Sequence, residues 1–303
     1  MFRKSNLVSQ ILNLERVKYQ YEKIMLIALI SALLIASGCG KSDNTNENQH
    51  MNHKNMQQGE NHEGMNNETN QSPDVTTQVV WKFSKETPKS NETVDLTIQI
   101  NDKEGKPIEK FDIQHEKLMH LIVVSKDLSY FDHLHPEYKG DGLFTTALNF
   151  PAGGEYKLYA DYVPKGASKV VKNHTVTVMG EKAQTTPLKP DENLTKVVDG
   201  KEITLSFDEL KAGKDVTLNF NIKDHKTGRP ITNLQPYLGA IGHVVIISED
   251  TEEYLHVHPM DEKAKGPDAK FMTKFPKSGI YKIWGQFQHE GKVITVPFVV
   301  KVS

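Results

Sequence analysis

Residues 94–102 read VDLTIQIND and residues 216–224 read VTLNFNIKD, two stretches in which apolar and polar side chains alternate. Alternation with a period of two is typical of a β-strand with one buried face, because successive side chains point to opposite faces of a sheet. The two stretches also match each other position by position, 122 residues apart. The pair therefore predicts both a β-rich fold and an internal repeat.

The repeat extends over most of the chain. Gly105-Lys-Pro107-Ile matches Gly228-Arg-Pro230-Ile, and the stretch that begins with Phe150-Pro matches the one that begins with Phe275-Pro. The offset stays between 122 and 125 residues, which indicates a duplicated domain. Helical periodicity is missing from both copies, and about seven short strands in about 100 residues are typical of an immunoglobulin-like β-sandwich.

The expected fold class is all-β, with two tandem immunoglobulin-like β-sandwich domains. We expect the first module at residues 77–182, the second at residues 199–303, and a linker at residues 183–198, where Pro187 and Pro190 lie. Each module is long enough to bury a core of its own.

Charge and cysteine content exclude several classes of function. The chain has 303 residues, with 37 Lys and Arg against 39 Asp and Glu and a net charge of −2. No nucleic acid partner is expected, because phosphate binding needs clustered cations. The one cysteine excludes an intramolecular disulfide, a thiolate zinc finger and a cupredoxin-type copper centre.

The N-terminal residues have the pattern of a targeting segment. Residues 24–38, IMLIALISALLIASG, follow several basic residues and fall short of the about 20 residues that a membrane span needs. Ala36-Ser37-Gly38-Cys39 resembles a bacterial lipobox. We therefore expect residues 1–38 to be a lipoprotein signal peptide and Cys39 to be lipidated, which holds the protein at the outer, extracytoplasmic face of the cell membrane. The alternative is a plain membrane anchor in which Cys39 has no role.

Residues 39–76 are expected to form a disordered, lipid-anchored tether. They are rich in Asn, Gln and Glu and contain almost no branched apolar residue, so they cannot bury enough surface to offset the entropy of ordering. Imidazole and thioether groups can gather late transition metals. The candidate secondary metal-collecting residues are His50, Met51, His53, Met56, His62 and Met65. The alternative is a chance composition in a solvated spacer.

One histidine pattern recurs in both copies. Each module contains H-x12-H-x-H-P, formed by His120, His133 and His135 in the first and by His243, His256 and His258 in the second. A hairpin that pairs residue 122 with residue 133, and residue 245 with residue 256, gathers three imidazoles on one patch of each module. Three neutral imidazoles around a common point bind Cu(II), Zn(II) or Ni(II).

Two structural alternatives stay open for these histidines. A repeated histidine can serve the fold, with an imidazole that hydrogen-bonds a loop carbonyl in each sandwich. A register slip of one residue moves His120 to the opposite face from the other two.

The order of motifs resembles a known group of domains. The order of a strand, a Gly-x-Pro-Ile turn, a strand ending in His, His-x-His-Pro and Phe-Pro-x-x-Gly-x-Tyr resembles the YtkA-like domain and the related FixH-like and CopC-like extracytoplasmic β-sandwiches. The resemblance implies a role in copper delivery or resistance.

We therefore expect a non-catalytic lipoprotein that binds copper, or else zinc or nickel. It would buffer the metal, confer resistance or pass the metal to a receiving envelope protein. One alternative is an envelope interaction or adhesion module with structural histidines, and another is a three-histidine zinc hydrolase.

Overall fold

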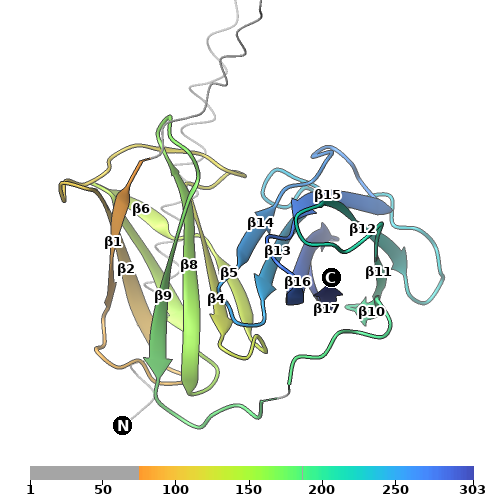
Figure 1. Cartoon of the computed structure of the whole chain (residues 1–303), viewed down its shortest axis with the longest axis horizontal. Coiled ribbons are helices and arrows are strands. Elements are labelled where there is room, and N and C mark those ends of the chain that lie inside the picture. Colours follow the sequence, from red (N-terminus) through yellow and green to blue (C-terminus); the bar gives the residue numbers. More distant parts are fainter. Residues whose placement is uncertain (1–74, 186) are drawn as a thin grey trace, which may run out of the picture. The chain divides into compact units, whose positions relative to one another are not determined.

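The computed structural model describes residues 75–185 and 187–303 (Figure 1). The predicted signal peptide, Cys39 and the tether residues His50 to Met65 lie outside the described residues. All regular secondary-structure elements within the described ranges are β-strands, so the expected all-β class is confirmed. None of the described residues forms a helix that is long and apolar enough to cross a membrane.

Two sheets make up the first module. One sheet has the order β1-β2-β7-β6, and the other has the order β3-β8-β4-β5 with β9 paired to β8. The strands are β1 (Thr77–Phe83), β2 (Thr93–Asp102), β3 (Phe111–Asp112), β4 (Met119–Ser125), β5 (Phe131–Leu134), β6 (Glu137–Gly140), β7 (Leu143–Asn149), β8 (Gly154–Pro164) and β9 (Val170–Val178).

The second module repeats this plan. Its sheets have the orders β10-β11-β12-β15 and β14-β13-β16-β17, and all pairings are antiparallel. The strands are β10 (Thr195–Val198), β11 (Lys201–Phe207), β12 (Asp215–Asp224), β13 (His243–Ser248), β14 (Tyr254–Val257), β15 (Asp268–Lys274), β16 (Gly279–His289) and β17 (Lys292–Val302).

Each module has its own core between its two sheets. The alternation in β2 buries Val94, Leu96 and Ile98, and the equivalent positions of β12 bury Val216 and Leu218. The period-two pattern therefore places one face of each strand inward, as the sequence predicts.

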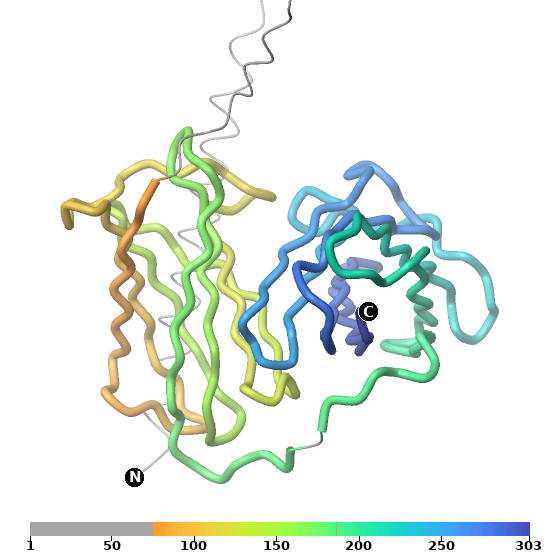
Figure 2. Tube along the Cα trace, viewed as in Figure 1, coloured from red at the N-terminus to blue at the C-terminus, as the bar shows by residue number. Residues whose placement is uncertain are grey.

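The connection between the modules ends earlier than expected. Residues 195–198, expected as linker, form β10, which pairs with β11 across Asp199 and Gly200 (Figure 2). Both turn residues have positive φ, 47° and 73°, as a two-residue type I′ hairpin requires. The Asp-Gly pair between Val198 and Lys201 is the sequence signal for this hairpin.

Strands β4 and β13 are buried on both faces. Leu121 and Val123 of β4 pack into the core of the first module, whereas Ile122 and Val124 point the other way. This second face packs against Val245 and Ile247 of β13, in a cluster that also holds Leu128, Tyr159 and Trp284. The two modules therefore bury the outer faces of two equivalent strands against each other.

Candidate metal centre

Both histidine hairpins form in the predicted register. Ile122 pairs with His133 in the β4–β5 ladder, and Val245 pairs with His256 in the β13–β14 ladder. A slip of one residue is thereby excluded in both modules. Because β5 ends at Leu134 and β14 ends at Val257, His135 and His258 lie one residue beyond their strands.

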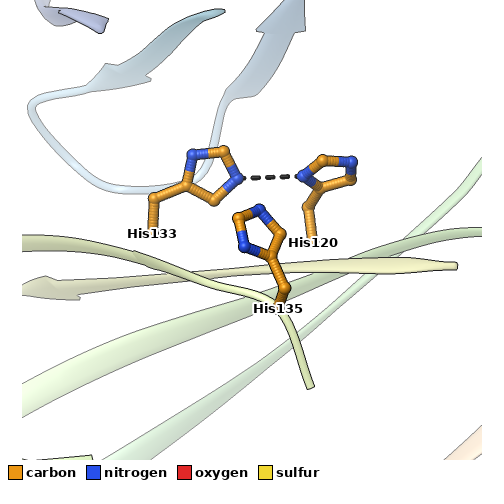
Figure 3. Close-up of side chains that lie close together, drawn as sticks. All are labelled: His120, His133 and His135. Carbon is orange, nitrogen blue, oxygen red and sulfur yellow. Dashed lines mark hydrogen bonds between the residues drawn. The ribbon is translucent and has the colours of Figure 1, made fainter. Parts of the chain in front are cut away.

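The first triad comes together as the spacing predicts. One ring nitrogen from each of His120, His133 and His135 lies within 4.8 Å of the others (Figure 3). His120 is 1% exposed and His133 is 9% exposed. His135 points toward the other two rings, and its buried Nε2 atom has no hydrogen-bond partner among the described residues.

The second triad is less compact. The rings of His243 and His256 have centroids 5.7 Å apart, and His258 stacks on His256 at 5.4 Å. His258 also contacts His115 of the first module, with ring centroids 4.3 Å apart and Nε2 of His115 against Nδ1 of His258.

One shared group replaces the two separate patches that the sequence predicts. The ring centroids of His120 and His256 are 5.0 Å apart, and those of His115 and His243 are 4.8 Å apart. We name this group the histidine cluster; it consists of His115, His120, His133, His135, His243, His256 and His258. Its physical reason is the apolar face that each triad shares with residues such as Ile122 and Val245, since the modules bury these faces against each other.

The contacts around the cluster are reciprocal. Phe131 of the first module stacks on Trp284 of the second at 4.7 Å, and the equivalent Tyr254 stacks on Tyr159 at 4.8 Å. Equivalent residues thus exchange equivalent contacts, which is the property of a two-fold interface between identical subunits. Here the interface forms within one chain because the domain is duplicated.

Backbone carbonyls fix the tautomers of two histidines. Nε2 of His120 lies 2.9 Å from the carbonyl oxygen of Gln114, and Nε2 of His243 lies 3.0 Å from that of Tyr237. A carbonyl oxygen only accepts hydrogen bonds, so each Nε2 carries the proton. The structural role that the sequence left open for these histidines is therefore present, and the Nδ1 atom of each neutral ring keeps a lone pair.

The other module fixes two more rings. Nδ1 of His256 donates to Oδ2 of Asp161 at 2.9 Å, and Nδ1 of His133 donates to Oε1 of Gln286 at 2.7 Å. Asp161 lies opposite His120 in the β4–β8 ladder, and Gln286 lies opposite His243 in the β13–β16 ladder, so the two acceptors are equivalent. The Nε2 atoms of His133 and His256 then keep their lone pairs.

Two pairs of lone pairs consequently face each other. Nδ1 of His120 is 2.9 Å from Nε2 of His133, and Nδ1 of His243 is 3.4 Å from Nε2 of His256. No proton lies between either pair when the rings are neutral. With bonds of 2.0–2.1 Å to a metal, neighbouring ligand nitrogens are about 2.9 Å apart at right angles and about 3.4 Å apart in a tetrahedron. Both separations, and the imidazole donors themselves, fit a late transition metal.

Burial keeps these rings neutral. Desolvation lowers the pKa of His133 to about 4 and that of His135 to about 3. Burial also lowers the pKa of His256 to about 3, despite the nearby carboxylate of Asp161. For Asp161 burial acts to raise the pKa, but the hydrogen bond from His256 and the charge of Lys169 bring the pKa down to about 2. The cluster thus offers neutral imidazoles and one supporting carboxylate at neutral pH.

The sequence did not reveal three members of this arrangement. His115 has no histidine partner in the other copy, and Asp161 and Gln286 are supporting residues rather than donors in the motif. One signal was available for Asp161, because it is the one acidic residue within the buried run YKLYADYV of residues 156–163. For His115 the sequence holds no such signal.

The chain belongs to the family described as DUF8832, a domain of unknown function, whose model matches residues 74–180 and again residues 196–303. The two matches confirm the tandem duplication. The matching model is not a YtkA-like, FixH-like or CopC-like one, so that resemblance stays a prediction. No curated protein matches the chain.

The chain also has low-scoring matches among solved structures. The chain is similar to FdeC, an adhesin of Escherichia coli, with 16% identity, a TM-score of 0.26 and coverage of 75% of this chain and 64% of that one. For the adhesin InvE of Yersinia pseudotuberculosis the identity is 12% and the TM-score is 0.23, with coverage of 74% of this chain and 58% of that one. For a two-domain fibronectin type III segment of chicken tenascin the identity is 15% and the TM-score is 0.22, with coverage of 74% of this chain and 98% of that one. The chain spans less than two thirds of the two adhesin chains, and at these TM-scores the likeness carries no argument.

Proposed function

We propose that this protein binds a late transition-metal ion, with copper as the first candidate, in the histidine cluster between its two modules. The observation that carries the proposal is the set of lone pairs in the cluster. Four rings each donate their one N–H to a carbonyl, amide or carboxylate oxygen, so that Nδ1 of His120 faces Nε2 of His133, and Nδ1 of His243 faces Nε2 of His256. A fixed tautomer with an outward lone pair is the usual state of a metal-ligating histidine.

The alternative ways to satisfy these nitrogens are poor. A proton between two rings would make an imidazolium, which burial disfavours at His133 and at His256. Within residues 75–185 and 187–303, the buried Nε2 of His135 has no hydrogen-bond partner either. A metal ion supplies positive charge and accepts several lone pairs at once, and imidazole nitrogen suits Cu(II), Zn(II) and Ni(II).

The biological role follows from the expected location. We propose that Cys39 anchors the protein at the outer face of the cell membrane, and that the tether histidines and methionines collect metal at low affinity. The proposed role is buffering, resistance or delivery to a receiving envelope protein, and it is non-catalytic.

Metal titration of the full chain tests the proposal. Wild type should bind Cu(II) with histidine nitrogens visible in the electron paramagnetic resonance spectrum. The His133→Gln/His135→Gln variant should lose at least ten-fold in affinity, because it removes two of the gathered donors. His225→Gln is the matched control, since His225 is exposed and outside the cluster. Unchanged affinity in a folded His133→Gln/His135→Gln variant overturns the proposal.

A second candidate is a metal-independent interaction module. It is supported by the outer strands β1 and β10, which leave Val80 55% and Val197 49% exposed at sheet edges. Unpaired strand edges can add a strand from a partner protein. If the folded wild-type chain binds neither Cu(II) nor Zn(II), this candidate becomes the leading one.

A further inference from the structure

A hollow opens onto the exposed side of the histidine cluster. Its volume is about 470 Å³, and its walls include His256, His258, Met260 and Met272. His256 is a member of the cluster and is hydrogen-bonded to Asp161, whereas His258 is exposed. The hollow therefore lies beside two members of the cluster, His256 and His258.

Strand pairing places the two methionines and His258 on one face. Pro259 forms an antiparallel bridge with Phe271, and the backbone N–H of Met260 donates to the carbonyl oxygen of Lys270. In this register His258 lies opposite Met272. Since side chains two residues apart share a face, Met260 points to the same side as His258, at a diagonal to Met272. Opposite Cβ atoms lie about 4.5–5.5 Å apart and diagonal ones about 7–8 Å apart, within reach of methionine side chains.

Packing does not account for these methionines. Met260 is 57% exposed and Met272 is 56% exposed, so neither thioether fills a core. Thioether sulfur and imidazole nitrogen together form a soft ligand set that suits Cu(I). Lys169 also lines the hollow, but its ammonium group is paired with Asp161 at 3.0 Å, which balances its charge.

We infer that Met260, Met272 and His258 form a surface site for a soft monovalent metal ion of the Cu(I) class, at the mouth of the histidine cluster. The further idea that metal passes from this surface site into the histidine cluster rests on the proposed function. The binding of the soft ion does not, because two of its three donors, the thioethers of Met260 and Met272, lie outside the cluster.

The test uses Ag(I) as the soft monovalent probe and the full chain labelled with methyl-¹³C methionine. The signals of Met260 and Met272, assigned by their absence in Met260→Leu and Met272→Leu, should shift on addition of Ag(I). The Met260→Leu/Met272→Leu variant should lose at least ten-fold in Ag(I) affinity at this site and keep its Zn(II) affinity within two-fold. Met179→Leu is the matched control, because Met179 is 55% exposed and lines a different hollow.

The two proposals fail separately. Methyl signals of Met260 and Met272 that stay unshifted at saturating Ag(I) overturn the surface site, whatever Zn(II) or Cu(II) does. Shifted signals in the His133→Gln/His135→Gln variant support the surface site independently of the cluster.

Discussion

The two halves of the histidine cluster share their backbone plan but differ in charge. Each half has a histidine at the start of a central strand, bonded through Nε2 to a loop carbonyl, and a second histidine bonded through Nδ1 to the other module. The acceptor for His133 is the neutral amide of Gln286, and the acceptor for His256 is the carboxylate of Asp161. Duplication has thus kept the hydrogen-bond plan of the first two histidines in each half, while substitution has made the two acceptors unequal in charge.

A second difference lies at the last histidine of each motif. His135 turns toward His120 and His133, whereas the equivalent His258 is exposed and contacts His115. His115 sits in a two-residue turn with φ of 46°, and the equivalent position of the second module holds Leu238 with φ of 53°. The first half is therefore the compact donor set, and the second half is the one that opens toward solvent.

The largest expected effect is on acid stability, where the halves should act together. In the metal-free protein the pKa of His133 is about 4 and that of His256 is about 3, against about 6.5 in an unfolded chain. Between these values the unfolded state binds more protons, so stability falls as the pH falls. Each of these two rings should lower the free energy of unfolding by on the order of 3 kcal/mol when the pH falls from 6.5 to 4.

Urea unfolding at a series of pH values measures this loss. A His133→Gln/His256→Gln variant should show a flatter acid limb, and His225→Gln should follow wild type. Equal slopes in all three proteins would mean that the cluster rings are not held neutral.

The next effect concerns the aromatic stacks. Trp284→Ala removes a buried ring that stacks on Phe131, and a large-to-small change of this kind costs about 3–5 kcal/mol. Tyr159→Phe keeps the equivalent stack on Tyr254 and removes only the hydroxyl that donates to the carbonyl of Thr251 at 2.6 Å. This change should lower the free energy of unfolding by about 1 kcal/mol. Urea unfolding separates the two. A cost below 1 kcal/mol for Trp284→Ala would show that the modules do not depend on this face.

The sequence predicted what depends on local pattern. The strands, the repeat and both hairpin registers follow from period-two alternation and from the spacing of His120 and His133, all within a short stretch of chain. At Asp199 and Gly200 the sequence holds the turn signal of a hairpin, but the nearby Pro187 and Pro190 favour a linker, so the linker prediction extends too far.

The union of the triads could not be predicted in the same way. His256 and Asp161 are 95 residues apart, and their contact depends on how one folded module packs on the other. One hint was available in residues 121–124, LIVV, and in residues 244–247, VVII, whose unbroken apolar character is typical of strands buried on both faces. Such a run predicts that another part of the protein packs on the outer face of the strand. It does not predict that this part is the other copy of the module.

The charge difference between the halves should show in metal affinity. Asp161→Asn turns the carboxylate behind His256 into an amide like that of Gln286, and loss of such a supporting group typically costs 10–100-fold in affinity. Gln286→Glu should do the opposite, since a carboxylate behind His133 makes that ring a stronger donor. Competition titration with Zn(II) measures both. Equal affinities for wild type, Asp161→Asn and Gln286→Glu would show that the inequality has no effect on binding.

The smallest effect should come from two equivalent lysines beside the aromatic stacks, Lys157 over the ring of Tyr159 and Lys282 over the ring of Trp284. Lys282 donates to the backbone carbonyl of Leu128 at 2.7 Å, whereas Lys157 pairs with the exposed carboxylate of Glu252 at 2.8 Å. Lys282→Met leaves a carbonyl without its partner and should cost about 1–2 kcal/mol. Glu252→Gln breaks only an ion pair with one exposed member and should cost about 0.5 kcal/mol or less. In 0.5 M salt the Glu252→Gln difference should vanish, because exposed ion pairs are screened, while the Lys282→Met difference should persist. If Glu252→Gln costs more stability than Lys282→Met, the hydrogen bond from Lys282 to the carbonyl of Leu128 contributes less than the ion pair between Lys157 and Glu252.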